Sequence, residues 1–357
     1  MATIRERPRV QGIFEDGYRR ESAEEPSPRA EHNHFLPARH SAQAMPCVSY
    51  RKARQEDFPG ITQLLRNTVD GLLRQRGFFE SSPFASSRAP PPNPQQGFPW
   101  FEMAIEEDAN GFWVAEVDHA LAGVGLSWVR GPLWYLAHLF IQPEHQGLNI
   151  GQTLLDKTLE HRGTVPITNK ALVTFAYNPV SISLYSRYGM YPREPLYFME
   201  APRQQLKTAK GNAKVRSERL ENFEISRKTL SKIDLENTGY VRERNHEFLF
   251  SLPTVQCHLF SLEQKPVGYA YIWKSGRIGP LAALTQSAFK AIVQSSMELA
   301  SQMDSPSVGM LVTGSNDTLM RTALDYKMRI QDNFLFMSST PLPNFSNYVL
   351  YPTGAML

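Results

Sequence analysis

The 357-residue sequence contains only two cysteines, Cys47 and Cys257. Two thiols cannot build a framework of disulfides or a cysteine zinc cluster, so both are expected to be ordinary thiols in a reducing compartment. No apolar run reaches the roughly 18 residues that a membrane-spanning helix needs. The N-terminus mixes arginines with acids and lacks the apolar stretch of a secretory signal. These absences predict a cytoplasmic protein with no membrane partner and no metal site.

The sequence holds enough apolar material for sizeable cores, with 41% hydrophobic and 11% aromatic residues. Its length predicts about two domains. The net charge of +3 is local, because residues 201–220 alone hold six Lys or Arg residues and one acid. We interpret this segment as a solvated basic linker, with a weak contact to an anion or RNA as the alternative. Nucleic acid is therefore not an expected partner.

Two further segments are expected to lack regular structure. Residues 1–46 carry seven Lys or Arg residues, seven acids and no apolar periodicity, which is typical of a disordered tail. The proline-rich stretch 80–98 cannot form a helix or a sheet strand, and a loop of this length often serves as a lid over a site.

The remaining residues alternate strand and helix patterns. A short strand (47–54) precedes a helix with one apolar stripe (55–79) and a second helix near 99–108. Two strands meet at Asp118-His119-Ala120, and the almost continuously apolar "LWYLAHLFI" (133–141) predicts a strand buried on both faces. A helix (148–161), a strand (171–177), a helix (179–188) and a closing strand (196–200) follow. The pattern predicts an α/β fold with a mixed central sheet flanked by helices.

Residues 221–338 repeat this plan. The segments 178–199 and 316–337 align without gaps at an offset of 138, with five identical positions that include Asn178/Asn316 and Tyr188/Tyr326. "GVGLSW" (123–128) aligns in the same order with "GYAYIW" (268–273). Two matched blocks in one order indicate an internal duplication. The second copy has no glycine in "LTQSAFKAIVQSS" (284–296), where the first copy has a glycine-containing loop.

That loop reads "PEHQGLNIGQTLL" (143–155) and lies between a buried strand and an amphipathic helix. The first turn of a helix leaves backbone N–H groups without partners, and these groups form an anion site with the positive end of the helix dipole. Asn149 occupies a position where such loops usually have glycine. Asparagine is among the few other residues that tolerate a positive φ, whereas most lose about 1–2 kcal/mol there. The loop is thus expected to bind a pyrophosphate.

Together, "LFIQPEHQGLNIGQTLLDKTLE" and "NPVSISLYSRYGMYP" resemble the two signature blocks of the GCN5-related N-acetyltransferase (GNAT) superfamily. The resemblance covers residues 48–200 and extends weakly to 221–338, the layout of tandem-GNAT proteins. It implies a catalytic, acetyl-CoA-binding domain at 47–200 and, beyond the linker, a degenerate GNAT-like domain with a C-terminal extension at 221–357.

The resemblance also implies roles for matching residues. Backbone groups at Phe140 and Ile141 would bind the acetyl carbonyl and the pantetheine amide, Asn178 would bind the pantetheine arm, and Tyr185 would protonate the departing CoA thiolate. Backbone N–H groups would hold the pyrophosphate of acetyl-CoA, the co-substrate, from Gln146, Gly147, Leu148, Asn149, Ile150, Gly151 and Gln152.

Several assignments stay open. Tyr185 is also compatible with a core aromatic on an amphipathic helix, and Asn178 with a plain helix N-cap. The amine needs a base, for which Glu102, Glu106 and His138 are candidates, although solvated surface suits the two acids and a buried core suits the histidine. The expected activity is transfer of acetyl from acetyl-CoA to a small-molecule or peptide amine by direct attack on the thioester. The alternatives are a non-catalytic acyl-CoA-binding or scaffolding module, or a different acyl group.

Overall fold

The computed structural model of the protein describes residues 47–75, 97–206, 212, 214–341 and 345–356. They all fall in one compact unit, Pro46–Leu357. The tail predicted at 1–46 lies outside the described residues, and so does nearly all of the lid predicted at 80–98. No helix in the described ranges has the length and apolarity to cross a membrane.

The first half of this unit alternates strands and helices as the sequence predicts. Its strands are β1 (Val48–Lys52), β2 (Phe112–Val117), β3 (Ala120–Arg130), β4 (Leu133–Ile141), β5 (Asn169–Phe175) and β6 (Tyr191–Pro202). Its helices are α1 (Phe58–Gln75), α3 (Trp100–Glu107), α4 (Ile150–Leu159) and α5 (Pro179–Arg187).

The second half repeats this order of elements after a short helix, α6 (Arg203–Leu206). Its strands are β7 (Arg216–Leu220), β8 (Val255–Leu262), β9 (Lys265–Trp273), β10 (Ile278–Ala283), β11 (Ser307–Thr313), β12 (Arg329–Ser338) and the added β13 (Tyr348–Val349). Its longer helices are α7 (Phe223–Thr238), α8 (Glu243–Ser251), α9 (Gln286–Ser301) and α10 (Asp317–Asp325). β6, α6 and β7 thus occupy much of the segment 201–220 that we expected to be a linker, because Arg216–Leu220 pairs with β8 as an edge strand.

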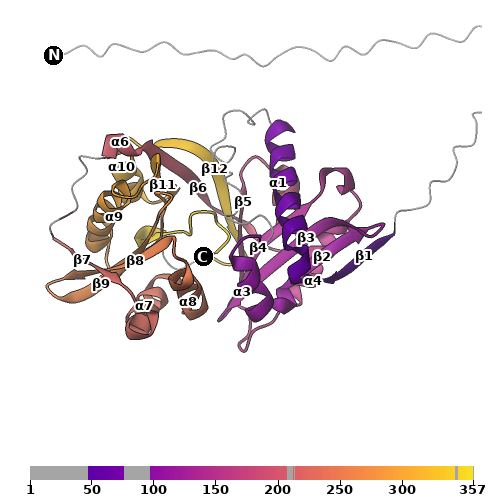
Figure 1. Ribbon diagram of the computed structural model, residues 1–357, viewed down its shortest axis with the longest axis horizontal. Coiled ribbons are helices and arrows are strands. Elements are labelled where there is room, and N and C mark those ends of the chain that lie inside the picture. The colour runs from indigo at the N-terminus through magenta and orange to yellow at the C-terminus, as the bar shows by residue number, and fades with distance from the viewer. Residues whose placement is uncertain (1–46, 76–96, 207–211, 213, 342–344, 357) are drawn as a thin grey trace, which may run out of the picture. The chain divides into compact units, whose positions relative to one another are not determined.

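The strands form two sheets (Figure 1). The larger sheet has the order β1-β2-β3-β4-β5-β12-β6-β11, and the smaller has the order β13-β10-β9-β8-β7. A parallel bridge between Arg277 and Gly309 links the β10 region to β11. The mixed α/β sheet flanked by helices, predicted from the sequence, is confirmed.

The two halves exchange their closing strands. β12 lies between β5 and β6, while β6 lies between β12 and β11. The two exchanges have the same register: Met337 pairs with Leu172 and Met199 pairs with Met310. Met337 lies 138 residues after Met199, and Met310 lies 138 residues after Leu172. Both separations equal the offset of the sequence repeat. The proposed duplication accounts for this symmetry, but the sequence did not predict that each half completes the sheet of the other.

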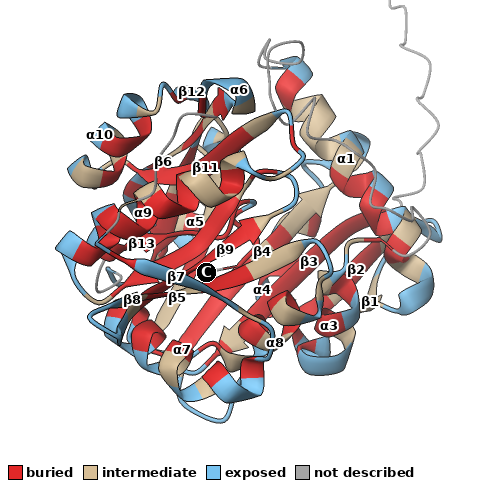
Figure 2. Cartoon of the chain, turned by 60° about the vertical axis from the view of Figure 1, so that its left-hand side comes forward, coloured by how far each residue is buried: buried red, intermediate tan, exposed pale blue. Residues whose placement is uncertain are grey.

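The faces of the larger sheet carry different helices. On β3, Val124, Leu126 and Trp128 belong to the core under α1 and α3, whereas a Cβ added at Gly123 or Gly125 would touch Leu154 of α4. Strand residues alternate between faces, so α1 and α3 cover one face and α4 covers the other. Figure 2 shows the strands as mostly buried and the outer sides of the helices as exposed.

Candidate active site

The larger sheet opens between its two parallel strands. β4 and β5 pair from Leu133–Asn169 to Leu136–Leu172, and no pairs continue beyond that point. At the same place Ala137 is an extra residue of β4, because Leu126 of β3 pairs with His138 and Ser127 pairs with Leu136. A bulge of this kind bends the strand. The end of β4 thus diverges from β5 and leaves a gap between the strands.

The register shows which backbone groups face this gap. The N–H of Gln142 donates to the carbonyl of Ala122 at 2.9 Å, so alternate residues, among them Phe140, direct their backbone groups toward β3. Those of Leu139 and Ile141 point the other way. In agreement, the Ile141 carbonyl accepts from Gln146 Nε2 at 3.2 Å, away from β3. The backbone groups of Leu139 therefore face the gap and those of Phe140 do not, and the sequence analysis did not single out Leu139.

The loop that follows β4 has the backbone expected of an anion site. Gly147 has φ 87° and Asn149 has φ 58°, both in the left-handed region. Asn149 is the N-cap of α4, but its side chain makes no capping hydrogen bond. The first N–H groups of α4 are consequently not capped by a side chain and remain available to an anion. The helix begins at Ile150 and not at the predicted residue 148, because left-handed backbone at Asn149 cannot continue a right-handed helix.

A cavity of about 720 Å³ passes through the gap. Tyr185 and all but one of the predicted cofactor-binding residues line it. The exception is Leu148, which is 44% exposed. The predicted residues in the lining are Phe140, Ile141, Gln146, Gly147, Asn149, Ile150, Gly151, Gln152 and Asn178. The rest of the lining comes from α1, the other residues of β4 from Leu136 to Leu139, Pro143, His145, β5, α5, Phe334 of β12 and residues 353–355 near the C-terminus.

The N-cap of α5 and two residues of the helix form a hydrogen-bonded chain in this lining. Asn178 is the N-cap: its Oδ1 accepts from the backbone N–H of Ser181 at 3.3 Å, and its Nδ2 donates to Ser181 Oγ at 2.9 Å. Burial raises the pKa of Tyr185, and a hydrogen bond from Ser181 partly opposes that rise. The chain Asn178–Ser181–Tyr185 therefore orients the phenol, and the sequence analysis missed Ser181.

The second half lacks each of these features except the cap. Asn316 caps α10 as Asn178 caps α5, accepting from the N–H of Leu319 at 2.9 Å. Leu319 and Ala323 stand where the first half has Ser181 and Tyr185. Capping alone thus accounts for the asparagine shared by both halves, whereas the hydroxyl and the phenol occur only beside the cavity.

The second half also lacks a site for the cofactor at its corresponding helix. Only residues 284–285 separate β10 from α9, and the side chain of Thr285 caps α9 by accepting from the N–H of Ala288 at 3.2 Å. A cavity beside α8 in this half has a volume of only about 10 Å³. Such a space holds about one water molecule.

The positions of the three candidate bases, Glu102, Glu106 and His138, do not favour a role in proton removal from the amine. Glu102 and Glu106 of α3 are exposed and do not line the cavity. His138 lines the cavity, but its Nε2 accepts a hydrogen bond from Trp100 Nε1 at 2.9 Å. Burial lowers the pKa of His138 to about 3. Its ring is therefore neutral with the proton on Nδ1, and its acceptor nitrogen is already occupied.

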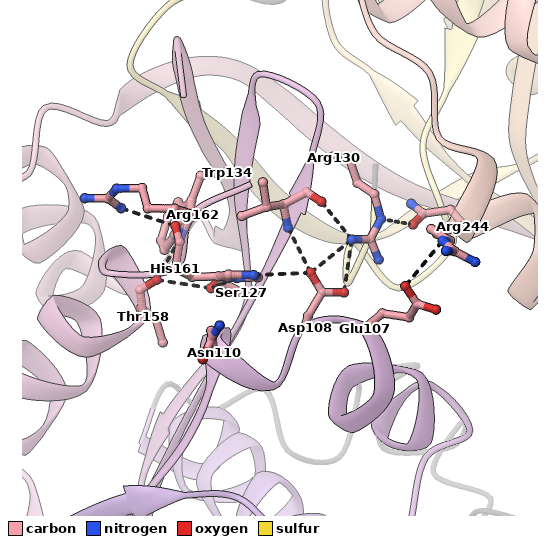
Figure 3. Close-up of polar contacts among 12 residues, drawn as sticks. Glu107, Asp108, Asn110, Ser127, Arg130, Trp134, Thr158, His161, Arg162 and Arg244 are labelled. Atoms are coloured by element: carbon pink, nitrogen blue, oxygen red, sulfur yellow. Dashed lines mark hydrogen bonds and ion pairs between the residues drawn. The ribbon is translucent and has the colours of Figure 1, made fainter. Parts of the chain in front are cut away.

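A separate polar cluster has the residue types of a hydrolytic triad (Figure 3). Ser127 Oγ lies 3.2 Å from His161 Nδ1, and His161 Nε2 lies 3.7 Å from Asp108. However, Ser127 is fully buried and donates its hydrogen to the carbonyl of Thr158, so it cannot also donate to the imidazole as a nucleophile would. Asp108 also pairs with Arg130, whose Nε donates to Asn245 of α8 at 2.7 Å. The cluster therefore joins the halves.

A mixed sheet that opens between two parallel strands, beside the uncapped N-terminus of a helix, defines the class of the GNAT acyltransferase fold. The sequence model of the acetyltransferase (GNAT) family matches residues 75–190. Residues 75–190 are thus similar to the GNAT family. No curated protein matches the sequence.

Solved structures resemble both halves together. A candidate acetyltransferase from Pyrococcus horikoshii is 14% identical, with a TM-score of 0.63 over 89% of this chain and 99% of its own. A GCN5-related N-acetyltransferase from Sphaerobacter thermophilus is 12% identical, with a TM-score of 0.57 over 84% and 98%. The GCN5-related glucosamine N-acetyltransferase region of a fungal β-N-acetylglucosaminidase is 12% identical, with a TM-score of 0.55 over 85% and 39%. At these identities the likeness shows the fold alone.

Proposed function

We propose that the protein is an acetyl-CoA-dependent N-acetyltransferase whose single active site lies in the first half, with the second half as a degenerate copy. One observation carries the proposal. A single cavity contains the uncapped N-terminus of α4, the backbone of β4 that faces the gap, and the phenol of Tyr185. These are the three groups that binding and cleavage of an acyl-CoA thioester require: an anion site, polar backbone partners for the arm, and a proton donor.

In the proposed reaction, the amine nitrogen attacks the thioester carbonyl, a C–N bond forms and the C–S bond breaks. The departing thiolate takes the proton of Tyr185, the nitrogen loses a proton to solvent, and the Tyr185 phenolate takes a proton back from solvent. The described lining residues include no carboxylate, so the amine is expected to react as its neutral form. The raised pKa keeps Tyr185 protonated up to at least pH 10. Deprotonation of Tyr185 therefore does not limit the reaction in neutral or mildly alkaline solution.

Substitution of Tyr185 tests the assignment of the acid. Tyr185→Phe keeps the ring in its cluster beside Trp134 and Leu172 but removes the proton donor. We expect kcat for CoA release with a panel of primary amines to fall by about 100-fold or more, while the Kd for acetyl-CoA changes little. Acetyl-CoA binding without turnover on any amine, with no effect of Tyr185→Phe, would instead indicate a non-catalytic binding module.

Ser181 is a positioning residue in the same test. Ser181→Ala removes the donor that stabilises the developing phenolate, so kcat is expected to fall by roughly 3–10-fold with an unchanged KM for acetyl-CoA. Ser181→Thr keeps the hydroxyl and should restore most of the rate. Ser183→Ala, an exposed position on the same helix, is the matched control. Equal effects of Ser181→Ala and Ser183→Ala would exclude the positioning role.

A further inference from the structure

The cavity has a second end, on the opposite face of the sheet from α4 and α5. The side chains there come from β4 (His138 and Phe140), from β5 (Val173 and Phe175) and from Phe334 of β12. They belong to the core under α1 and α3 or pack against it. If the cofactor lies on the α4 and α5 side of the gap, the acceptor amine must enter from this end.

This acceptor end is apolar and rich in rings. The rings of Phe175 and Phe334 lie 5.1 Å apart at 36°, and those of His138 and Phe140 lie 5.9 Å apart at 46°. Aromatic pairs prefer offset-stacked or edge-to-face contacts, so a further ring could pack against these side chains in the same way. Phe334 comes from the second half, so the strand exchange supplies part of this wall.

The described residues of the acceptor end also carry no negative charge that could pair with a cation. Among the described residues that line the cavity, Arg187 of α5 is the only one with a full charge, and it comes from the opposite face. His138 is neutral, because its Nε2 is occupied by the Trp100 N–H. A second ammonium group on a bound amine would therefore be buried without a partner, which is strongly unfavourable.

The segment Thr353–Ala355 forms one wall of this end of the cavity. Trp128 Nε1 donates to the carbonyl of Ala355 at 2.7 Å, and the Tyr135 hydroxyl donates to that of Gly354. Gly354 has φ 67°, and a Cβ added there would lie 2.9 Å from a methyl group of Val173. These contacts hold the segment against β3, β4 and β5. It is consequently a fixed part of the wall, with the side chain of Thr353 exposed.

We propose, on the basis of the function proposed above, that the acceptor is a primary amine whose remaining part is uncharged, apolar and about the size of an aromatic ring. Polyamines are not expected as acceptors, because the described residues of the acceptor end offer no carboxylate for a second ammonium group, and amino sugars are not expected because most of these residues are apolar. The segment Thr353–Ala355, contributed by the second half, is a specificity-determining wall of the site in the first half.

The first test compares kcat/KM for CoA release with 2-phenylethylamine, hexylamine, 1,4-diaminobutane and glucosamine on the full-length protein. We expect 2-phenylethylamine to exceed 1,4-diaminobutane by at least about 100-fold, because the second ammonium group has no partner. A better rate with the diamine or with glucosamine would overturn the proposal while leaving acetyl transfer intact.

The second test separates amine selectivity from catalysis. Binding of the same four amines to protein saturated with CoA, measured by calorimetry, does not need turnover. Tight binding of 2-phenylethylamine without any transfer would refute the proposed function but support the apolar acceptor end. Binding of none of the amines, or preferential binding of the diamine, would overturn the selectivity itself.

A charge placed in the wall gives the sharpest test. Thr353→Glu adds a carboxylate at the acceptor end, whereas Thr353→Gln adds a similar volume without charge. We expect Thr353→Glu to shift the kcat/KM ratio toward 1,4-diaminobutane by about 10-fold or more. Thr353→Gln should keep the preference for 2-phenylethylamine. The same ratio in both variants would show that Thr353 does not face the bound acceptor.

Discussion

Asn149 begins α4 in the left-handed conformation, and its side chain makes no capping hydrogen bond. The residue thus starts the helix through the backbone conformation that it tolerates and not through a side-chain cap. Gly147, two residues earlier, has φ 87° and open space around the position of a Cβ. The loop therefore needs two residues that accept a positive φ, of which only one is glycine.

Two substitutions at Asn149 test this interpretation. Asn149→Gly is expected to preserve or tighten acetyl-CoA binding, because glycine adopts the same conformation without strain. Asn149→Ala should weaken it by roughly 5–30-fold, which corresponds to the cost of about 1–2 kcal/mol for a left-handed L-residue. The measurement is the Kd for acetyl-CoA of both variants and of the parent, determined by calorimetry. A clear loss of affinity in Asn149→Gly would show that the side chain itself contacts the cofactor.

The sequence predicted those parts of the site that depend on local pattern. The glycine-containing loop, the tolerance of Asn149 for positive φ and the position of Tyr185 on α5 all follow from residues close together in the chain. Leu139 could not be distinguished from Phe140, because the extra residue at Ala137 changes which backbone groups face the gap. Ser181 was missed because its role depends on a hydrogen bond to Tyr185 that no composition or spacing rule requires.

The contact between α3 and β4 has a consequence for stability. Trp100 donates to His138 Nε2, and burial lowers the pKa of His138 to about 3. In the unfolded chain the histidine takes up a proton below about pH 6.5, which the folded protein does not do until about pH 3. The stability contributed by the neutral ring is therefore complete above pH 6.5 and is lost as the pH falls toward 3.

His138→Gln isolates this effect, because glutamine keeps an acceptor for Trp100 but does not titrate. Between pH 6.5 and 4.5, the free energy of unfolding of the variant should fall by about 2 kcal/mol less than that of the parent. Urea denaturation at the two pH values measures the difference. If both proteins lose stability equally over this range, His138 does not remain neutral in the folded state.

The starts of the corresponding helices α4 and α9 differ in the length of the preceding loop and in the side-chain cap. The first turn of α9 is capped by Thr285, whereas that of α4 follows a longer loop and has no side-chain cap. The absence of glycine from 284–296 predicted the loss of the glycine-containing loop, but not that Thr285 caps α9. The acceptor end could not be predicted, because β12 and the segment Thr353–Ala355 reach it from more than 150 residues away in the chain.

The exchange of closing strands makes each half dependent on the other. β6 pairs with β12 along most of its length and with β11 on its other edge, and both partners come from the second half. β12 likewise pairs with β5 and β6 of the first half. A half on its own would expose long unpaired strand edges, which favour aggregation. The candidate active site would also lose Phe334 and Thr353–Ala355.

We therefore expect that residues 46–210 and 211–357 do not fold when produced separately, because each lacks the partners of its closing strand. Produced together in one cell, the two fragments should co-purify as a 1:1 complex that binds acetyl-CoA. Size-exclusion chromatography measures assembly of the fragments, circular dichroism measures folding, and calorimetry measures binding of acetyl-CoA. The intact chain cut at an engineered protease site within 207–211 is the control, since it starts from the folded state. A soluble 46–210 fragment that unfolds cooperatively and binds acetyl-CoA with parental affinity would refute this dependence and would make the first half an independent domain.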